Sequence, residues 1–142
     1  MKREIEILDN FIRERGLRHT PQREVILRVF LSIEKHLSVD ELYTIVKRRN
    51  PKIGYVTVYR TMKMLEDAGL CNEIDFGDGV SRFEHQYGHG HHDHLVCLKC
   101  GSYIEVINPE IEKLQDELAR RNRFVPLKHK LQIFGTCNKC LG

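Results

Sequence analysis

Four cysteines in the second half of the chain have the types and spacing of metal ligands. Cys97 and Cys100 form one C-x2-C pair, and Cys137 and Cys140 form a second pair near the end of the sequence. Four thiolates are the ligand set of a closed tetrahedral zinc site, which holds a fold together. The sequence therefore predicts one structural zinc ion.

A second set of metal-binding residues lies just before the first cysteine pair, where residues 89–94 read His-Gly-His-His-Asp-His. Imidazole and carboxylate groups are harder ligands than thiolates and suit a divalent ion that exchanges. We expect His91, His92 and His94 to be ligands rather than ordinary surface residues, because they lie beside a C-x2-C pair. A permanent ion combined with an exchangeable ion is typical of a metal sensor.

Length and composition indicate a small protein with no membrane segment. The chain has 142 residues, enough for one domain or two small ones. No stretch approaches the roughly 20 apolar residues that span a bilayer, and the charged N-terminus lacks the apolar core of a signal peptide. We therefore expect a cytoplasmic protein whose paired cysteines are metal ligands rather than disulfides. The fifth cysteine, Cys71, is expected to be a buried or half-buried structural thiol.

The distribution of charge is more informative than the net charge of +3. No acidic residue occurs between Glu41 and Glu66. Local basic patches are what a phosphate backbone requires, although a solvated helix face has the same composition. The basic residues form two groups: Arg13, Arg15, Arg18, Arg23 and Arg28, and then Lys47, Arg48, Arg49, Lys52, Arg60 and Lys63.

The first 50 residues have the pattern of three helices. Apolar spacing predicts a helix over 3–15 that ends at Gly16. Thr20-Pro21 is typical of an N-cap followed by a first helical residue, and an apolar stripe follows it. Ser38 begins a capping box, which predicts a third helix over 39–49.

The next segments predict a fourth helix and a β-hairpin. Residues 54–68 begin with β-branched residues that would suit a strand, but their apolar spacing favours a helix. Polar and apolar residues then alternate on both sides of a Gly77-Asp78-Gly79 turn. Helices followed by a hairpin describe a winged helix, whose last helix enters the DNA major groove. A small helical domain with a hairpin lid is the alternative.

The composition changes after Glu84, and short strands are expected at 93–96, 102–107 and 130–134, with a helix over 109–122. Such a unit is small for an independent core, so we expect the four-cysteine zinc site to staple it. An unpaired edge strand and an apolar helix face also suggest self-association.

The predicted fold class is therefore α+β. A winged helix-turn-helix DNA-binding domain is expected over 1–84, followed by a small α/β metal-binding dimerisation domain over 85–142.

Two motifs carry a resemblance to a known family. The first is Gly54-x-Val56-Thr57-Val58-Tyr59-Arg60, and the second is His91-His92-Asp93-His94-Leu95-Val96-Cys97-x2-Cys100-Gly101. Together they resemble the ferric uptake regulator family of bacterial metal-dependent repressors, and the similarity extends over nearly the whole chain. The resemblance implies a homodimer that binds double-stranded DNA at a palindromic A·T-rich operator.

The resemblance also implies three metal sites. The four cysteines match a structural Zn2+ site. Glu105 stands where family members place an acid near the other two sites, and we expect it as an additional ligand. Nitrogen and oxygen ligands accept ferrous iron, manganese or zinc, so ligand type does not decide the metal. The matching residues are His36, Glu84, His92 and His94 for the regulatory site, and His91, Asp93, Glu112 and His129 for a further site inside the dimerisation domain.

On the DNA side, Tyr59 and Arg60 match base-reading positions of the recognition helix. A tyrosine ring suits a thymine methyl group, although a core aromatic is the alternative for Tyr59. Arg18 matches a residue that reaches the minor groove, where a narrow A·T-rich groove attracts arginine, and Arg23 matches a phosphate contact.

Three other histidines match no fixed position of the family. His19 is expected to be an ordinary surface or core residue, while His85 and the Gly88-His89-Gly90 stretch are expected to form a hinge loop.

The predicted function is a metal-responsive transcriptional repressor that controls iron uptake genes, with Fe2+ as the regulatory metal and Mn2+ or Zn2+ as substitutes. Zinc-uptake and peroxide-sensing regulators are alternatives in the same family, and peroxide sensors favour aspartate where Glu105 stands. A zinc metalloenzyme would need an open coordination position and a general base in a cleft, and no residues resemble a substrate pocket. A metal storage protein would not need the Tyr59-Arg60 helix. We therefore expect a regulator and not an enzyme.

Overall fold

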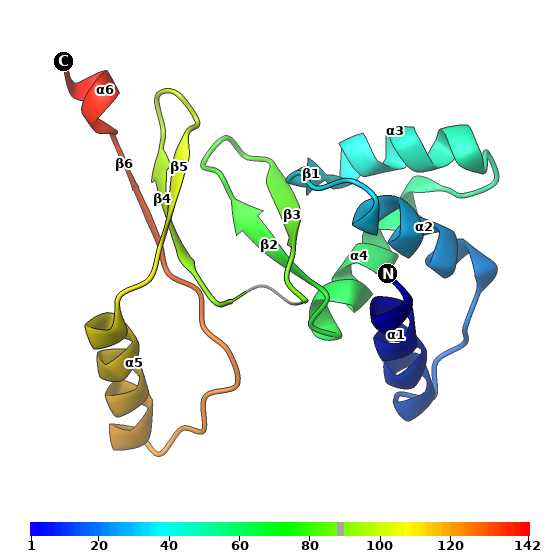
Figure 1. The fold of residues 1–142 in the computed structure, drawn as a ribbon, viewed down its shortest axis with the longest axis horizontal. Helices are drawn as coiled ribbons and strands as arrows, with labels where there is room; N and C mark the ends of the chain where they lie inside the picture. The colour runs from blue at the N-terminus through cyan, green and yellow to red at the C-terminus, as the bar shows by residue number, and fades with distance from the viewer. Residues whose placement is uncertain (88–89) are drawn as a thin grey trace. The chain divides into compact units, whose positions relative to one another are not determined.

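The computed structural model describes residues 1–87 and 90–142. It contains two compact units, Met1–Gly90 and His91–Gly142 (Figure 1). The domain boundary expected after Glu84 falls shortly before this division, and the functional extent of each domain stays a prediction. The predicted hinge loop is wrong for His85, which is the last residue of the strand Ser81–His85 and places its Nε2 2.8 Å from the Phe30 carbonyl oxygen. Gly88 and His89, the other residues of the predicted hinge apart from Gly90, lie outside the described residues.

The first unit begins with helices whose ends follow local sequence signals. Gly16, beyond the end of the first helix, has a φ of 63°, a conformation that glycine adopts without strain. The Thr20 side chain accepts a hydrogen bond from the backbone N–H of Arg23, and Pro21 opens the second helix. The helices of this unit are α1 (Lys2–Glu14), α2 (Pro21–Leu31), α3 (Val39–Arg49) and α4 (Tyr55–Asp67), which confirms the predicted order.

The capping box at the start of α3 is complete. The Ser38 hydroxyl accepts from the Glu41 backbone N–H at 3.1 Å, and the Glu41 carboxylate accepts from the Ser38 N–H at 3.1 Å. These two bonds satisfy backbone groups that a helix start otherwise leaves without partners. They also fix the position of the two-residue strand β1 (Leu37–Ser38), which leads into the helix.

The predicted hairpin forms the wing. Strands β2 (Cys71–Asp75) and β3 (Ser81–His85) are antiparallel, and β1 joins them to give the sheet order β1-β3-β2. In this sheet Leu37 is paired with Phe83. The pairing brings the residue before β1, which is His36, beside the end of the wing. The sequence did not predict β1, because two residues give no periodicity.

The core of the first unit lies under α4 and the wing. Val58, Met62 and Leu65 occupy the inner face of α4 and are completely buried, as are Phe30 of α2 and Cys71. Cys71 is therefore the structural thiol that was expected. This packing leaves the opposite face of α4 in solvent, as a winged helix requires of its recognition helix.

The second unit is a three-stranded sheet with two helices. Its sheet order is β5-β4-β6, with β4 antiparallel to β5 and parallel to β6. The predicted strands and long helix are confirmed, whereas the last helix was not predicted because it has only four residues. The elements are β4 (Asp93–Cys97), β5 (Tyr103–Val106), α5 (Pro109–Arg121), β6 (Gln132–Gly135) and α6 (Asn138–Leu141).

Little apolar surface is buried in the second unit. Val96 and Cys97 are its buried hydrophobic residues among those described, and α5 has no buried side chain. Leu114 and Leu118 on α5 are each 62% exposed. A unit with so small a core needs another source of free energy, such as a bound metal ion or a second copy of the chain.

None of the described helices combines the length and the hydropathy that crossing a membrane would require.

Candidate metal centres and nucleic-acid interface

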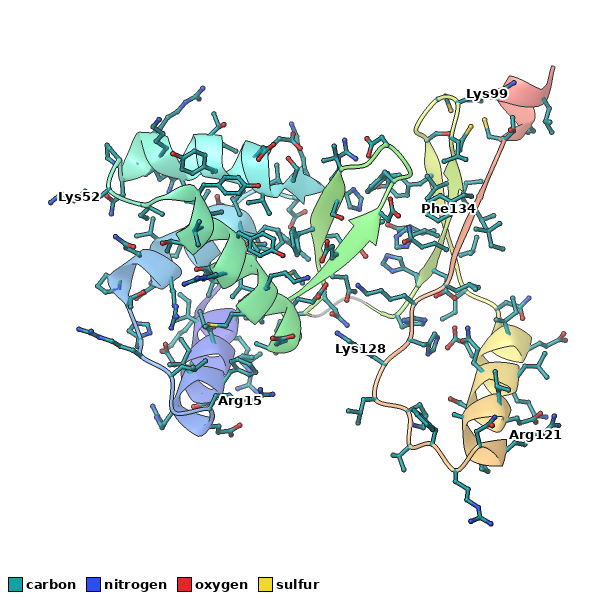
Figure 2. All side chains as sticks on the ribbon, turned by 180° about the vertical axis from the view of Figure 1, so that it is seen from behind. Arg15, Lys52, Lys99, Arg121, Lys128 and Phe134 are labelled. Atoms are coloured by element: carbon teal, nitrogen blue, oxygen red, sulfur yellow. The ribbon has the colours of Figure 1, made fainter. Side chains whose placement is uncertain are left out.

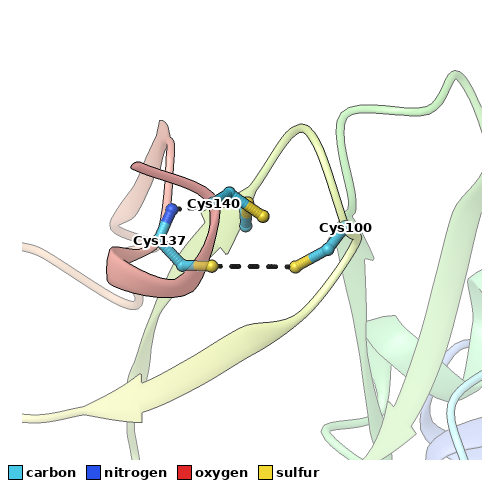
Figure 3. A group of neighbouring side chains, drawn as sticks. Cys100, Cys137 and Cys140 are labelled. Atoms are coloured by element: carbon cyan, nitrogen blue, oxygen red, sulfur yellow. Dashed lines mark hydrogen bonds between the residues drawn. The ribbon is translucent and has the colours of Figure 1, made fainter. Parts of the chain in front are cut away.

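The four cysteines come together in the second unit, with Cys97 and Cys100 on one turn and Cys137 and Cys140 around α6 (Figure 3). All four sulfur atoms lie within 4.8 Å of one another. Cys100 Sγ is 3.8 Å from Cys137 Sγ, too far for the roughly 2.05 Å of a disulfide bond. Four thiols gathered this closely fit the ligand set of a structural zinc site.

Local backbone geometry shapes this cluster. Gly101 has a φ of 74° and donates its N–H to the Cys97 carbonyl at 2.9 Å, which closes the turn between β4 and β5. Ser102, which the sequence did not single out, places its hydroxyl 2.9 Å from Cys100 Sγ. Its position directly after the C-x2-C-Gly motif is the signal that could have revealed it.

Hydrogen bonds shift the pKa values of two of the thiols in opposite directions. Backbone N–H groups of Cys100 and Cys137 lower the pKa of Cys97 to about 6. In contrast, hydrogen bonds to Cys137 and Cys100 raise the pKa of Cys140 to about 12. Four neighbouring thiols cannot all ionise without a cation, because like charges disfavour one another. A divalent ion with four thiolate ligands removes that conflict, so the residues fit structural zinc.

A second cluster in the same unit contains His91, Asp93, Glu112 and His129, whose ligand atoms also lie within 4.8 Å of one another. His91 Nε2 is 3.2 Å from Asp93 Oδ1 and 3.3 Å from Glu112 Oε1. Neither of these buried carboxylate oxygens has a hydrogen-bond partner among the described residues, so the contacts lack hydrogen-bond geometry. Nitrogen and oxygen atoms that point toward one another without hydrogen bonds between them are arranged as the ligands of a cation are.

Two neighbouring histidines lower the pKa of Glu112. Loss of hydration by itself raises its pKa, but the hydrogen bond and charge of His129, with the charge of His91, lower the pKa overall. His129 Nε2 lies 2.9 Å from Glu112 Oε2. The Glu112 carboxylate therefore stays ionised to a lower pH than an ordinary glutamate, and it is available as an oxygen ligand.

A third group of nitrogen and oxygen ligands lies on the β4–β5 pair. His94 and Glu105 are directly opposite each other in the register, and His92 Nε2 is 3.6 Å from Glu105 Oε1. The ligand atoms of His92, His94 and Glu105 lie within 4.8 Å of one another. His91 and Asp93 belong to the preceding cluster, so neighbouring residues of this segment fall into two separate clusters. Whether each cluster holds a metal ion stays a prediction.

The other two residues predicted for the regulatory site contact each other in the first unit. His36 Nε2 is 3.0 Å from Glu84 Oε2, a contact that the β1–β3 pairing creates. Phe76 lies edge-on to the His36 ring, with centroids 5.4 Å apart, and restricts its orientation. The sequence did not single out Phe76, because no local pattern connects it with His36.

The outer face of α4 carries the predicted base-reading residues. Tyr59 is 48% exposed, so the core-aromatic alternative is wrong, and Arg60 is also exposed. Other basic residues of this unit are exposed, among them Arg15 at the end of α1, whose guanidinium lies over the Phe11 ring, and Lys52 in the α3–α4 connection (Figure 2).

The loop between α1 and α2 presents Arg18, which is exposed. Arg23 is half-buried as a residue, and its guanidinium donates to the Arg18 carbonyl. Arg23, predicted as a phosphate contact, therefore also fixes the backbone that carries Arg18.

We expect Cys97→Ser or Cys140→Ser to unfold the second unit or make the protein monomeric. Structural zinc contributes on the order of 10 kcal/mol of folding free energy in small domains, and little apolar burial is available here to replace it. The measurements are zinc content, melting temperature and sedimentation. Cys71→Ala is the control for zinc content, because it removes a thiol that lies in the other unit, within the hydrophobic core and away from the cluster. A Cys140 variant that stayed dimeric with an unchanged melting temperature would contradict the assignment.

Comparison with known proteins identifies the family. The sequence profile of the ferric uptake regulator family matches residues 14–134. A ferric uptake regulation protein of Rhizobium leguminosarum bv. viciae is 45% identical over 128 residues, which cover 90% of this chain and 89% of that protein. The relatives are named as regulators, so the comparison does not support an enzymatic function.

Solved structures give the same result. A Helicobacter pylori ferric uptake regulator, described as having three functional metal-binding sites, matches with a TM-score of 0.74 and 28% identity, covering 99% of this chain and 93% of that chain. A zinc-bound manganese uptake regulator matches with a TM-score of 0.54 and 45% identity, covering 92% of this chain and 98% of that chain. With its winged helix, thiol cluster and histidine-carboxylate clusters, the chain belongs to the ferric uptake regulator family of metal-responsive, DNA-binding transcription regulators.

Proposed function

We propose that this protein is a cytoplasmic ferrous-iron-dependent repressor of iron uptake genes, which binds a palindromic A·T-rich operator as a homodimer. The family supports the DNA-binding dimeric regulator, and relatives named for ferric uptake regulation support the iron assignment. One observation carries the proposal: each unit holds only part of the ligand set that the regulatory metal would need. His36 and Glu84 contact each other in one unit, and His92, His94 and Glu105 gather in the other.

The proposed regulatory site combines His36, Glu84, His92 and His94, with Glu105 as an additional ligand. A bound divalent ion supplies the free energy that favours the domain arrangement in which all of these residues are ligands. A ligand shifts an equilibrium only by its difference in affinity between two states, so residues from both units are essential to the switch. His36 is held by β1, and Glu84 by β3, so both follow the DNA-binding unit.

The other two clusters have separate proposed roles. Cys97, Cys100, Cys137 and Cys140 hold Zn2+ and stabilise the fold. His91, Asp93, Glu112 and His129 form a further site within the dimerisation domain, and the H. pylori relative with three functional metal-binding sites supports this count. Exposed apolar residues on α5 and on the edge strands of the second unit, among them Leu114, Leu118 and Ile104, supply a surface for the second subunit.

On DNA, Tyr59 and Arg60 are proposed to read base edges in the major groove, with Arg18 in the minor groove and Arg23 near a phosphate. The exposure of Tyr59 on the outer face of α4 supports this role. Phosphate contacts supply affinity at any sequence, while base contacts supply specificity.

The candidate alternative is a manganese-responsive regulator with the same mechanism. It is favoured by the 45% identity to a solved manganese uptake regulator, which equals the identity to the Rhizobium ferric uptake regulation protein. Oxygen and nitrogen ligands hold either ion, and no thiolate occurs in the proposed regulatory set to select between them.

The test of the proposed function is operator affinity during anaerobic titration with Fe2+, Mn2+ and Zn2+ in turn. We expect metal-free protein that retains its structural zinc to bind weakly, and Fe2+ to restore binding at micromolar or lower free concentration. If Mn2+ at its cellular concentration saturated operator binding and Fe2+ had no effect, the regulatory metal would be manganese rather than iron. Metal-independent operator binding would contradict the switch.

His36→Ala should uncouple metal binding from DNA binding. The ligands of the second unit remain, so metal still binds, but the two domain arrangements then offer more similar ligand sets. We expect the variant to fold, dimerise and keep its structural zinc, while needing at least tenfold more metal for half-maximal operator binding. Lys35→Ala, an exposed neighbour, is the control. An unchanged metal midpoint would show that sensing resides in the second unit alone.

Tyr59→Ala should weaken operator binding by about 1–3 kcal/mol and leave binding to random DNA nearly unchanged, because a base contact is lost. Arg23→Ala should weaken both DNAs and reduce the salt dependence, because a phosphate contact is lost. Fluorescence anisotropy at several salt concentrations measures both effects. Equal losses on both DNAs for Tyr59→Ala would exclude base reading by this residue.

A further inference from the structure

Lys63 of α4, the proposed recognition helix, is paired with acidic residues of its own unit. Its Nζ donates a hydrogen bond to Glu73 Oε2 of β2 at 2.7 Å and lies 3.7 Å from Glu66 Oε1 of α4. The hydrogen bond to Glu73, together with the two carboxylate charges, raises the pKa of Lys63, although partial burial lowers it. In the sequence, Lys63 belongs to a basic group that would suit a phosphate backbone, but in the structure its charge is already matched by an acid.

Glu73 is held in place by backbone contacts. Its N–H donates to Glu66 Oε2 at 2.8 Å, and it is paired with Phe83 in the register of the wing. The side chains of Glu66 and Glu73 are 11% and 28% exposed, so both carboxylates lie against the unit rather than in open solvent. Exposed ion pairs contribute little partly because two long side chains lose freedom when they meet. The strand and the Glu66 contact reduce that loss for Glu73, which makes its pair with Lys63 more persistent than a pair between two free surface chains.

Lys63 lies on the face of α4 that is proposed to meet DNA. It follows Tyr59 by four residues, which places the two side chains one turn apart on the same side of the helix. Tyr59, Arg60 and Lys63 also line one hollow in the surface, next to the end of α1. The N-terminal residues of a recognition helix read base edges, so a cation one turn later is placed for a phosphate. The Lys63 side chain is 41% exposed, and an unpaired ammonium group here could reach one.

An unpaired lysine at this position would strengthen binding to every DNA sequence. A lysine that neutralises a phosphate releases a counterion, and this contribution does not depend on the bases. A metal-responsive regulator with a large sequence-independent affinity binds DNA even without its metal, so such contacts weaken the control. When Lys63 is paired with Glu73, the two charges sum to zero, and a phosphate contact first requires that the ion pair and its hydrogen bond be broken.

We propose that Glu73 limits the sequence-independent affinity of this protein for DNA, by holding Lys63 away from the phosphates. Glu73 acts through Lys63 and makes no contact with DNA itself. The neutral pair lets α4 and the wing approach a duplex without an additional contact that any sequence would satisfy. Base reading by Tyr59 is separate from this effect. The inference rests on the proposed role of α4 as the recognition helix.

Two other roles for the pair lead to different results. If the pair only fastens the wing to α4, loss of Glu73 lowers stability and leaves DNA binding unchanged or weaker. If Lys63 leaves Glu73 and contacts a phosphate in the DNA complex, removal of the whole pair weakens binding. Under the proposal, loss of Glu73 alone makes binding tighter, and removal of the whole pair changes little because no net charge is lost.

The experiment measures the affinity of the full-length protein for a random-sequence duplex, by fluorescence anisotropy at saturating Mn2+ and from about 50 to 200 mM salt. The proteins are the wild type, Glu73→Gln, and the double variant Lys63→Gln/Glu73→Gln. Asp67→Asn is the matched control, because Asp67 is an exposed acid of α4 that forms no ion pair with Lys63 among the described residues. All of the proposed metal ligands are retained, and the melting temperature of each variant verifies folding.

We expect Glu73→Gln to bind random DNA more tightly and with a steeper salt dependence. Each lysine released to a phosphate should make the slope of log affinity against log salt more negative by about 0.9, so the gain over the wild type should shrink about threefold per contact over this salt range. The double variant should reproduce the affinity and the slope of the wild type. Asp67→Asn, which removes the same charge but frees no lysine, should tighten binding without this change in slope.

Either of two results would overturn the proposal. One is weaker binding with a shallower slope for the double variant, which would show that Lys63 contacts a phosphate in the wild type. The other is a slope for Glu73→Gln that matches the slope for Asp67→Asn. Should Glu73→Gln fail to fold, Glu73→Thr gives the same loss of charge with a residue that suits a strand.

The wild-type measurement separates this failure from failure of the proposed function. If wild-type affinity for the duplex does not fall with salt, the basic surface around α4 does not meet DNA, and the proposed function is contradicted. If it falls with salt in the wild type while Glu73→Gln behaves as the wild type does, only the role of Glu73 is wrong.

Discussion

The thiol cluster is the constraint on which the second unit depends. Cys97 ends β4, and Gly135 of β6 is paired with it only two residues before Cys137. The zinc ion proposed for the four cysteines would therefore lock β4 to β6 at one end of the sheet. The other end of β4 carries Asp93 and His94, the residues on which both histidine-carboxylate clusters are built. Because this unit buries little apolar surface, we infer that the proposed zinc ion would keep those residues in place.

The two kinds of ligand are separated by chemistry and by geometry. Thiolates occupy the closed site, where slow exchange suits a structural ion. Nitrogen and oxygen ligands occupy the clusters around the start of β4, where they suit ions that exchange. The alternation of His91, His92, Asp93 and His94 divides these ligands between two sites. One short segment thus supports a site inside the dimerisation domain and part of the proposed regulatory site.

In the first unit, packing decides which residues of α4 face outward, and strand pairing decides which residue His36 contacts. Burial of Val58, Met62 and Leu65 turns Tyr59 and Arg60 outward on α4. The short strand β1 has a different effect, because its pairing with β3 places His36 at 3.0 Å from Glu84. Helix α4, proposed to read DNA, and the His36–Glu84 pair, proposed as metal ligands, therefore flank one hydrophobic core. An ion bound to the pair would have a physical route by which to influence the helix.

The sequence by itself determined the features that depend on local signals: the two C-x2-C pairs, the Ser38 capping box, the helix start at Thr20-Pro21 and the hairpin around Gly77–Gly79. It also separated the ligands of the histidine segment, because alternation along a strand is a local property. Tertiary structure decided the rest. Strand β1 and helix α6 are too short to show a period, and they form because β3 and the cysteine turn offer partners. The contacts of Lys63 with Glu73, and of Phe76 with His36, join residues whose separation in sequence follows no rule. Only the packing of the helices and the wing brings them together.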